Sequence, residues 1–443
     1  MPYFDKYYQR MPDGTIKQIN PYNGTEVWCV EERKRGPILN AVPRNPVPLR
    51  VSIPENYCDF CCSKYELCTP EKARVVREAD GKWRKYYRVE SEKPGGCSAD
   101  FRLVGNLFEI VTYDYWAKNY HYKMNKTNRD WKEKYLSSPK GYNHAMKMLE
   151  IKLNRMGADF SSMPEDEKIE KLNPFFGGSH DLIIGKRHYR EGAKFTHELC
   201  SSGEMTVEEH FQYILFTAES VKDLFDQNHF IRYIIVFQNW LRPAGASFDH
   251  LHKQLVGLDE WGVQMEREMA ELNRNQNLYN EFSINFGIYH SMILAENDYA
   301  IAVTEIGHRF PTVVVYSKSE TSRPFEQTRE EIKGMSDLVH AVHCVTTSQT
   351  TCNEEWYYSP FDSVYSMPWR ICIKLRIHTP AGFEGNTEIY INPVHPRKLA
   401  SELAKLLEIK RDEGLICPDI RIGGEVKREP NVLKYYKNKL KRL

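Results

Sequence analysis

The chain has 443 residues, of which 41% are hydrophobic, 12% aromatic and 27% charged, so it can fold around a substantial core. Its 61 lysines and arginines balance 60 aspartates and glutamates, so no overall charge attracts nucleic acid or an anionic membrane surface. No apolar run approaches the roughly 20 residues that span a bilayer, and the first residues lack the apolar core of a signal peptide. We therefore expect a soluble, cytoplasmic protein that binds neither nucleic acid nor membranes.

The elements of the first part of the chain are predicted in the following order. Residues 1–56 are rich in turn formers and prolines and are expected to form an irregular lead-in. Strands are predicted at 83–90 and 101–112, and residues 117–176 show helical spacing, with a helix that ends at Gly157. A buried strand follows at 180–189, then a helix that starts at the capping box Thr206-x-x-Glu209, then a central strand at 231–239.

The second part of the chain repeats this order of elements. The polar sequence of residues 260–280 indicates a helix, which would link two halves of the chain. Beyond it, strand, turn and strand are predicted at 299–318, a helix at 322–347 and a strand at 368–378. The repeated order indicates an internal duplication, with one domain at 1–260 and a second at 281–443.

The cysteines are unevenly spaced along the chain. Four of the eleven lie between Cys58 and Cys68, and an odd number without an export signal argues against a disulfide framework. Two thiolates and two histidines make a closed tetrahedral zinc site, so Cys58 and Cys61 are candidate ligands together with His188 and His250. Ordinary reduced cysteines are the alternative.

Residues 245–257 read GASFDHLHKQLVG and carry the strongest chemical signal. In a strand, His250, His252 and Gln254 would all point to one face, where unpaired burial would cost about 1–3 kcal/mol for each group. They therefore line a site or face solvent. A neutral histidine can attack phosphorus when its other ring nitrogen donates to an acceptor, and Ser247 and Gln254 could donate to the phosphate oxygens.

Four segments in order resemble the galactose-1-phosphate uridylyltransferase family, the nucleotidyltransferase branch of the histidine-triad superfamily. They read YCDFC…TPEKARV, FRLVGNLFEIV, SHDLIIGKRH and FQNWLRPAGASFDHLHKQ, and together they lie within residues 28–258. The family signature is His-x-His-x-Gln, and hydrolase branches of the superfamily have a third histidine where this chain has Gln254. The resemblance implies an α+β fold of two tandem histidine-triad-like halves, with mainly antiparallel sheets and packed helices.

The resemblance also implies roles for individual residues. His252 would be the nucleophile, with Gln254 and Ser247 as the other catalytic residues. The structural zinc would be bound by Cys58, Cys61, His188 and His250. The nucleotide would be bound by Asn239 at the phosphate, Asn106 at the ribose, Phe108 and Phe237 near the base, and Arg35 from a basic segment that can equally be a solvated run of charge. A homodimer is suggested.

We therefore predict a nucleotidyltransferase that works through a covalent nucleotidyl-histidine intermediate. The donor would be a nucleotide-sugar or a similar pyrophosphate compound, and the acceptor a phosphorylated small molecule. The alternatives are a phosphorylase of dinucleoside polyphosphates or nucleotide-sugars, which uses the same histidine, and a non-catalytic nucleotide-binding protein.

The C-terminal half departs from the family pattern. Cys372 and Lys374 stand about where the family has a second metal-binding pair, and Asn392 stands where a carboxylate is expected, so neither a second metal nor galactose is expected. Lys374 and Arg376 alternate on one strand and face either an anionic acceptor or solvent. Lys253, between the signature histidine and glutamine, points away from the site and is expected to be a surface lysine.

Overall fold

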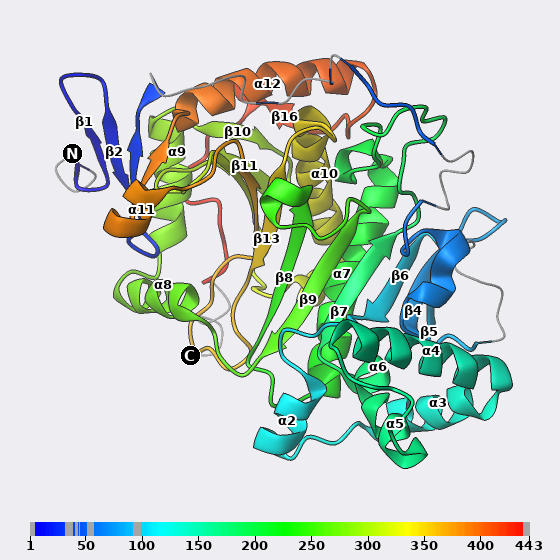
Figure 1. Ribbon diagram of the computed structural model, residues 1–443. Coiled ribbons are helices and arrows are strands. Elements are labelled where there is room, and N and C mark those ends of the chain that lie inside the picture. Colours follow the sequence, from blue (N-terminus) through cyan, green and yellow to red (C-terminus); the bar gives the residue numbers. More distant parts are fainter. Residues whose placement is uncertain are drawn as a thin grey trace.

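A continuous sheet of twelve strands runs through the molecule (Figure 1). The computed structural model describes residues 5–31, 39, 43, 45–50, 57–91 and 99–436. The strand order is β16-β10-β11-β12-β14-β13-β8-β9-β7-β6-β4-β5, and each of its pairings is antiparallel. The strands of the first half are β4 (Glu71–Arg77), β5 (Trp83–Tyr87), β6 (Phe101–Gly105), β7 (His180–Gly185), β8 (Tyr233–Trp240) and β9 (His252–Leu258). Those of the second half are β10 (Ile293–Glu296), β11 (Ala300–Thr304), β12 (Thr312–Ser317), β13 (Cys352–Tyr357), β14 (Arg370–Leu375) and β16 (Arg421–Ile422).

The sheet consists of two copies of one strand order that meet where β8 pairs with β13. Outward from this seam the strands run β8, β9, β7, β6, β4 on one side and β13, β14, β12, β11, β10 on the other. In each half a long helix leads back to the seam strand, α7 (Val207–Gln227) to β8 and α10 (Arg329–Thr346) to β13. Both begin with a capping box, from Thr206 to Glu209 and from Thr328 to Glu331. The predicted α+β class and the two similar halves are confirmed.

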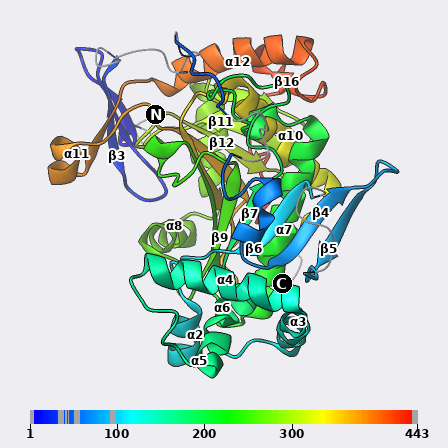
Figure 2. The same ribbon diagram turned by 45° about the vertical axis from the view of Figure 1, so that its right-hand side comes forward.

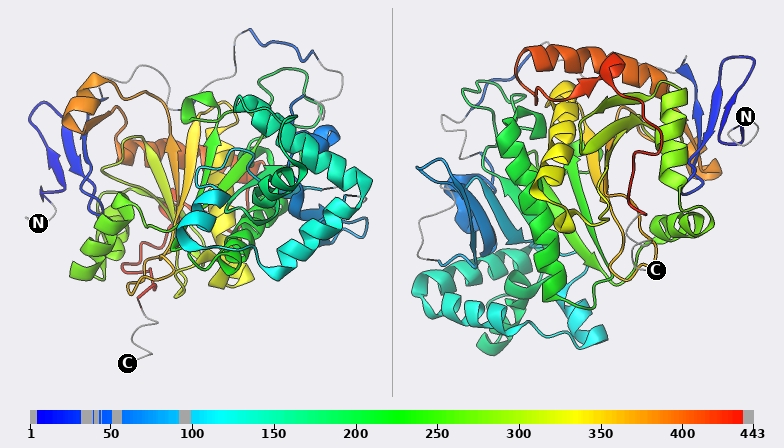
Figure 3. Two further views of the ribbon diagram at one scale, coloured as in Figure 1. Left: turned by 60° about the horizontal axis from the view of Figure 1, so that its bottom comes forward. Right: turned by 180° about the vertical axis from the view of Figure 1, so that it is seen from behind.

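The two long helices cover the back of the sheet, where Figure 3 shows them side by side in its right-hand view. Both are buried along most of one face, and they pack against each other. None of the helices in the described chain is both long and apolar enough to span a membrane.

Five helices between β6 and β7 form a group at the lower edge of the sheet (Figure 2). The predicted helix end is confirmed, since Gly157 takes a left-handed φ of +74° directly after this group's longest helix. The five helices are α2 (Tyr113–Tyr120), α3 (Lys126–Ser137), α4 (Pro139–Arg155), α5 (Glu165–Lys171) and α6 (Asn173–Gly177).

The prediction of an irregular lead-in over residues 1–56 is wrong for its first part. The strands β1 (Tyr8–Arg10), β2 (Ile16–Ile19) and β3 (Glu26–Cys29) form a small sheet, which β15 (Ile389–Asn392) completes by pairing parallel to β3. Strands of three or four residues are too short to show a recognisable alternation. The start of the chain thus packs with its C-terminal part, and the domain boundaries at 260 and 281 stay a prediction.

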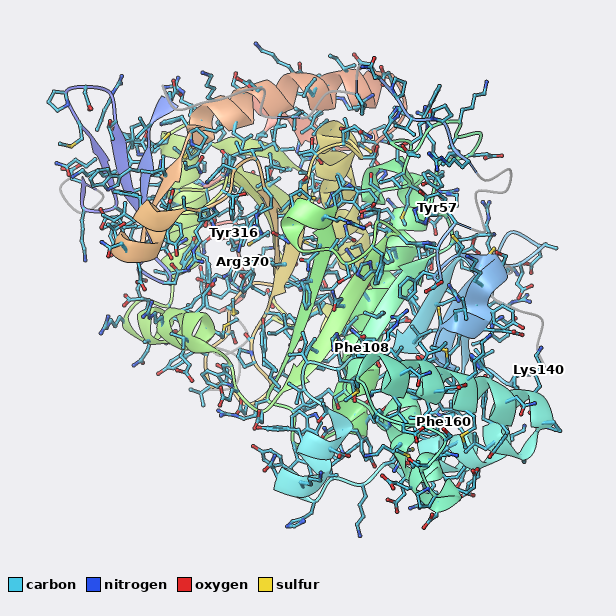
Figure 4. The ribbon with its side chains drawn as sticks, viewed as in Figure 1. Tyr57, Phe108, Lys140, Phe160, Tyr316 and Arg370 are labelled. Carbon is cyan, nitrogen blue, oxygen red and sulfur yellow. The ribbon has the colours of Figure 1, made fainter. Side chains whose placement is uncertain are left out.

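The predicted linker helix is α8 (Val263–Arg274), and it also fills the front of the second half. Its Glu268 is fully buried and forms an ion pair of 2.6 Å with Arg370 of β14. Arg370 lies opposite Tyr316 of β12, and Figure 4 shows both labelled in this region.

The remaining elements are the π-helical turn η7 (Asn280–Asn285), the helices α9 (Phe286–Tyr289), α11 (Gly382–Thr387) and α12 (Pro396–Asp412), and the 3-10 turns η3 (Cys62–Leu67), η5 (Ser202–Glu204), η6 (Arg242–Ala244), η8 (Pro324–Glu326) and η9 (Gly423–Glu425).

Lys253 is not the surface lysine that the sequence predicted. Its side chain is 0% exposed, and its Nζ lies 2.5 Å from Glu354 Oε1 of β13 and 3.2 Å from Gln238 Oε1 of β8. The other carboxylate oxygen of Glu354 lies 2.9 Å from His343 Nε2 of α10. Alternation correctly turns Lys253 away from His252, but that side of β9 faces α7 and α10 rather than water. The buried pair therefore joins the two halves behind the seam.

Replacing Lys253 with methionine is expected to lower the free energy of unfolding by about 3–5 kcal/mol, because the Glu354 carboxylate would stay buried without its cation. Urea denaturation followed by circular dichroism measures the change. The matched control is Lys118→Met, since Lys118 pairs with Asp114 where 76% and 59% of the two side chains are exposed. There the change should stay below about 0.5 kcal/mol. Equal losses in the two variants would contradict the role assigned to the buried pair.

Candidate active site and metal centre

Four potential metal ligands from three parts of the chain meet at the ends of β7 and β9. The ligand atoms of Cys58, Cys61, His188 and His250 lie within 4.8 Å of one another. The two Sγ atoms are 3.8 Å apart, and Cys58 Sγ lies 3.2 Å from His188 Nδ1 and 3.5 Å from His250 Nδ1. Metal–ligand bonds of about 2.0–2.3 Å in a tetrahedron place ligand atoms about 3.3–3.8 Å apart. The cluster therefore fits a tetrahedral metal ion.

The surroundings of the cluster orient its ligands. His250 donates from Nε2 to the carbonyl oxygen of Gly185 at 2.6 Å, which turns its Nδ1 toward the two sulfur atoms. The ring of Tyr57 lies edge-on to that of His188, with 5.1 Å between their centroids. The ten cysteines in the described part of the chain are all free thiols. The structure thus brings together the four ligands that the sequence proposed.

His252, the first residue of β9, lies next to this cluster but is not part of it. Its side chain is buried, with 3% of the residue exposed. Its Nδ1 lies 2.8 Å from the backbone carbonyl oxygen of His250, so Nδ1 carries the hydrogen and Nε2 the lone pair. Burial lowers the pKa of His252 to about 4, which keeps the ring neutral. The Phe248 ring lies 4.4 Å from it, centroid to centroid.

The turn that precedes His252 is held from the second half of the sheet. It contains η6 and Gly245, whose left-handed φ of +95° suits glycine. Asn353 of β13 donates from Nδ2 to the carbonyl oxygen of Ala244 at 2.8 Å and to Asn239 Oδ1 at 2.7 Å. Arg376 donates to Asn353 Oδ1 at 2.8 Å. The turn that carries Ser247 is therefore fixed by a residue on the other side of the seam.

His252 opens into a pocket of about 640 Å³ on the front of the sheet. Four other residues proposed from the sequence line the same pocket: Gln254, Ser247, Asn106 and Phe108. Phe108 follows β6 rather than lying in it, because the strand ends at Gly105 and Asn106 Oδ1 accepts from the Phe108 backbone N–H at 3.0 Å. Figure 4 shows Phe108 at the lower ends of the central strands, above α4.

Three other candidate residues lie elsewhere. Phe237 pairs with Gln254 across β8 and β9 and Asn239 lies two residues further on the same face, but neither lines the pocket. Arg35 lies outside the described residues.

Helix α4 supplies a wall of the pocket that the sequence analysis did not identify. Met148, Ile151 and Arg155 all line it, and their spacing of three and four residues places them on one face of the helix. The Arg155 guanidinium lies 5.9 Å from the centroid of the Phe108 ring and 4.0 Å from the carboxylate of Asp59. Among the described residues, Arg155 is the single lysine or arginine that lines the pocket. The sequence showed the helical spacing of these residues, but it did not show that α4 packs close to the strands of the pocket.

The second half does not repeat this site. In the place of β9 it has β14, whose Arg370, Cys372 and Lys374 face the front. Lys374 forms an ion pair of 2.5 Å with Glu355, and 20% of its side chain is exposed. In the part of the chain that the structure describes, the cluster around Cys58 is the one group of side chains arranged to hold a metal.

Comparison with known proteins agrees with this fold. The sequence matches a family described as "Domain of unknown function (DUF4921)" over residues 11–435. A crystal structure of an ADP-glucose phosphorylase from Arabidopsis thaliana with bound ADP-glucose is similar in fold, with 16% identity, a TM-score of 0.56 and coverage of 88% of this chain and 97% of that one. A GALT-like protein from Arabidopsis thaliana has 16% identity and a TM-score of 0.52, over 88% of this chain and 98% of that one. No curated protein matches the sequence. The fold that the resemblance implied is confirmed.

The purified protein is expected to carry about one tightly bound metal ion per chain, measured by inductively coupled plasma mass spectrometry. Cys61→Ser should lose the ion and unfold at a lower temperature, because a metal site contributes its binding free energy to folding. Cys417→Ser, at a buried thiol outside the cluster, is the matched control and should keep the metal. A metal-free wild type, purified without chelator, would contradict the assignment.

Proposed function

We propose that this chain, which belongs to the DUF4921 family, is a nucleotidyltransferase that transfers a nucleoside monophosphate through a covalent intermediate on His252. The observation that carries this proposal is the state of His252 in the pocket. The ring is neutral, its Nδ1–H donates to the His250 carbonyl, and its Nε2 lone pair is left for attack. The similar fold of an enzyme that was solved with a nucleotide-sugar supports a donor of that class.

In the first step the Nε2 lone pair of His252 attacks the α-phosphorus of the donor. The bond from that phosphorus to the bridging oxygen breaks, and a sugar phosphate leaves with the electron pair. The ring becomes positively charged, and the His250 carbonyl that accepts from Nδ1–H stabilises this charge. Gln254 and Ser247, which line the same pocket, donate to the non-bridging phosphate oxygens.

In the second step an oxygen of a phosphate-bearing acceptor attacks the phosphorus of the nucleotidyl-histidine. The phosphorus–nitrogen bond breaks, and its electron pair returns to Nε2. The Cys58, Cys61, His188 and His250 cluster would hold a structural zinc, whose chemistry is to fix its four ligands and, with them, the backbone at residue 250. Homodimer formation and the absence of nucleic-acid binding stay predictions.

A second candidate is a phosphorylase, in which inorganic phosphate is the acceptor. The first step is the same and the product is a nucleoside diphosphate. The similar fold of an ADP-glucose phosphorylase favours this candidate over the alternative of a protein that only binds nucleotides. The identity of the acceptor decides between transferase and phosphorylase.

Incubation with nucleotide-sugars labelled with ³²P at the α-phosphate is expected to label the protein itself. The label should be lost in acid and retained in alkali, as a phosphorus–nitrogen bond requires, and His252→Asn should abolish it. His121→Asn is the matched control, because His121 is exposed, lies outside the pocket and has a left-handed φ of 55° that asparagine tolerates. Equal labelling of His252→Asn and the wild type would overturn the mechanism. Chasing the label with a sugar phosphate or with inorganic phosphate identifies the acceptor.

Arg155→Gln is expected to weaken the binding of a nucleoside diphosphate or nucleotide-sugar about tenfold and that of a nucleoside less, because Arg155 is the cation that lines the pocket in the described chain. Calorimetric titration in a His252→Asn background measures affinity without turnover. Lys147→Gln on the same helix, outside the pocket, is the matched control. If Arg155→Gln weakens the binding of a nucleoside as much as that of a nucleoside diphosphate, Arg155 does not contact phosphate.

A further inference from the structure

His180 is a buried histidine that no step above uses. It is the first residue of β7 and is 1% exposed, and it lines the same pocket as His252. Its Nδ1 lies 3.0 Å from the backbone nitrogen of Ile110. Its Nε2 lies 3.1 Å from Gln254 Oε1 and 3.0 Å from Asn106 Nδ2. Both ring nitrogens of His180 thus have neighbours that restrict where its hydrogen can be.

The backbone contact determines which nitrogen of His180 carries the hydrogen. A backbone N–H is always a donor, so Nδ1 must accept from Ile110 and the neutral ring must carry its hydrogen on Nε2. Burial lowers the pKa of His180 to about 4, so the ring is neutral at neutral pH. The acceptor within reach of Nε2–H is the side-chain oxygen of Gln254.

This hydrogen bond also determines how the Gln254 amide is turned. An amide has an oxygen at one end and two hydrogens at the other, so an oxygen held at His180 directs the hydrogens elsewhere. The flipped amide would set an N–H group against Nε2–H and leave a buried donor unpaired, at a cost of about 1–3 kcal/mol. Gln254 lines the pocket, and its hydrogens are therefore available to a bound ligand.

The neighbouring Asn106 amide is oriented by the backbone. The oxygen of this amide accepts from the Phe108 backbone N–H, so its nitrogen is the atom that faces His180. Two donors cannot bond to each other, so the Asn106 hydrogens need an acceptor other than His180, such as an oxygen of a ligand or of water. The Phe108 N–H thus orients the Asn106 amide, and His180 orients the Gln254 amide.

We propose that His180 is a positioning residue that holds the amide hydrogens of Gln254 toward the phosphate oxygens of the ligand. The inference deepens the proposed function and rests on it for the identity of the reaction. It assigns the pocket to ligands that accept hydrogen bonds at this position, as phosphate and pyrophosphate groups do. It also means that position 254 gives no proton to a leaving group.

A double-mutant cycle tests the proposal. Inorganic pyrophosphate is the probe, because it needs no particular base, and its dissociation constant is measured by calorimetry alongside the rate of His252 labelling. His180→Leu should raise the dissociation constant about fivefold to tenfold and slow labelling about 10-fold to 100-fold, as should Gln254→Ala. The double variant should be no worse than Gln254→Ala alone, since His180 acts through Gln254. His180→Gln keeps an N–H near the position of Nε2 and should recover most of both losses.

The variants also separate positioning from a loss of fold. Unchanged metal content and unfolding temperature in His180→Gln show that the site is intact when its binding and labelling are measured. The proposal would be overturned if the losses in pyrophosphate affinity and labelling rate multiply in the double variant. It would also be overturned if His180→Leu is unimpaired, or if the wild type does not bind pyrophosphate. A wild type that binds pyrophosphate with the expected coupling but never labels would instead refute the proposed transfer reaction and leave the positioning role standing.

Discussion

The hydrogen bond from His252 Nδ1 to the carbonyl oxygen of His250, at 2.8 Å, links the two parts of the site. Residue 250 takes part in both, because its side chain belongs to the metal-ligand cluster and its carbonyl orients the His252 ring. A contact that fixes the His250 ring therefore also restrains the carbonyl of the same residue. The Gly185 carbonyl contributes from the other side by accepting from His250 Nε2 at 2.6 Å. A cluster that performs no chemistry can in this way determine the direction of the Nε2 lone pair of His252.

The second half of the sheet has no such site but supports the first. Behind the seam, Lys253 of β9 and Glu354 of β13 form a fully buried ion pair. In front of the seam, Asn353 of β13 holds the turn that carries Ser247 through the carbonyl of Ala244. Buried ion pairs recover little of the cost of removing their charges from water, so their effect lies in specifying one arrangement. The pair and the asparagine both specify how β13 lies against β8, and the active half depends on that register.

Much of the fold and most of the site could be predicted, because local patterns determine them. Capping boxes mark the starts of α7 and α10, alternation places His252 and Gln254 on one face, and the Cys58-x-x-Cys61 spacing indicates a metal. What could not be predicted depends on contacts between distant parts of the chain. Alternation turns Lys253 away from the site without showing that helices cover that face. Arg155 joins the pocket through the packing of α4, and the role of His180 depends on the backbone N–H of Ile110.

The hydrogen-bonding character of position 254 limits the chemistry that this site can perform. A histidine there could give a proton to a leaving group, whereas a glutamine amide has no proton to transfer. With the Gln254 oxygen held at His180, the amide is restricted to donating hydrogen bonds. The leaving group must then be stable as an anion without protonation, as a sugar phosphate or phosphate is. By the same argument the second step of the proposed reaction favours an acceptor that is already anionic, because the Gln254 amide cannot take a proton from a water or an alcohol. A neutral His252 ring, a donor-only amide and the Arg155 cation together favour the proposed transfer between phosphates over hydrolysis.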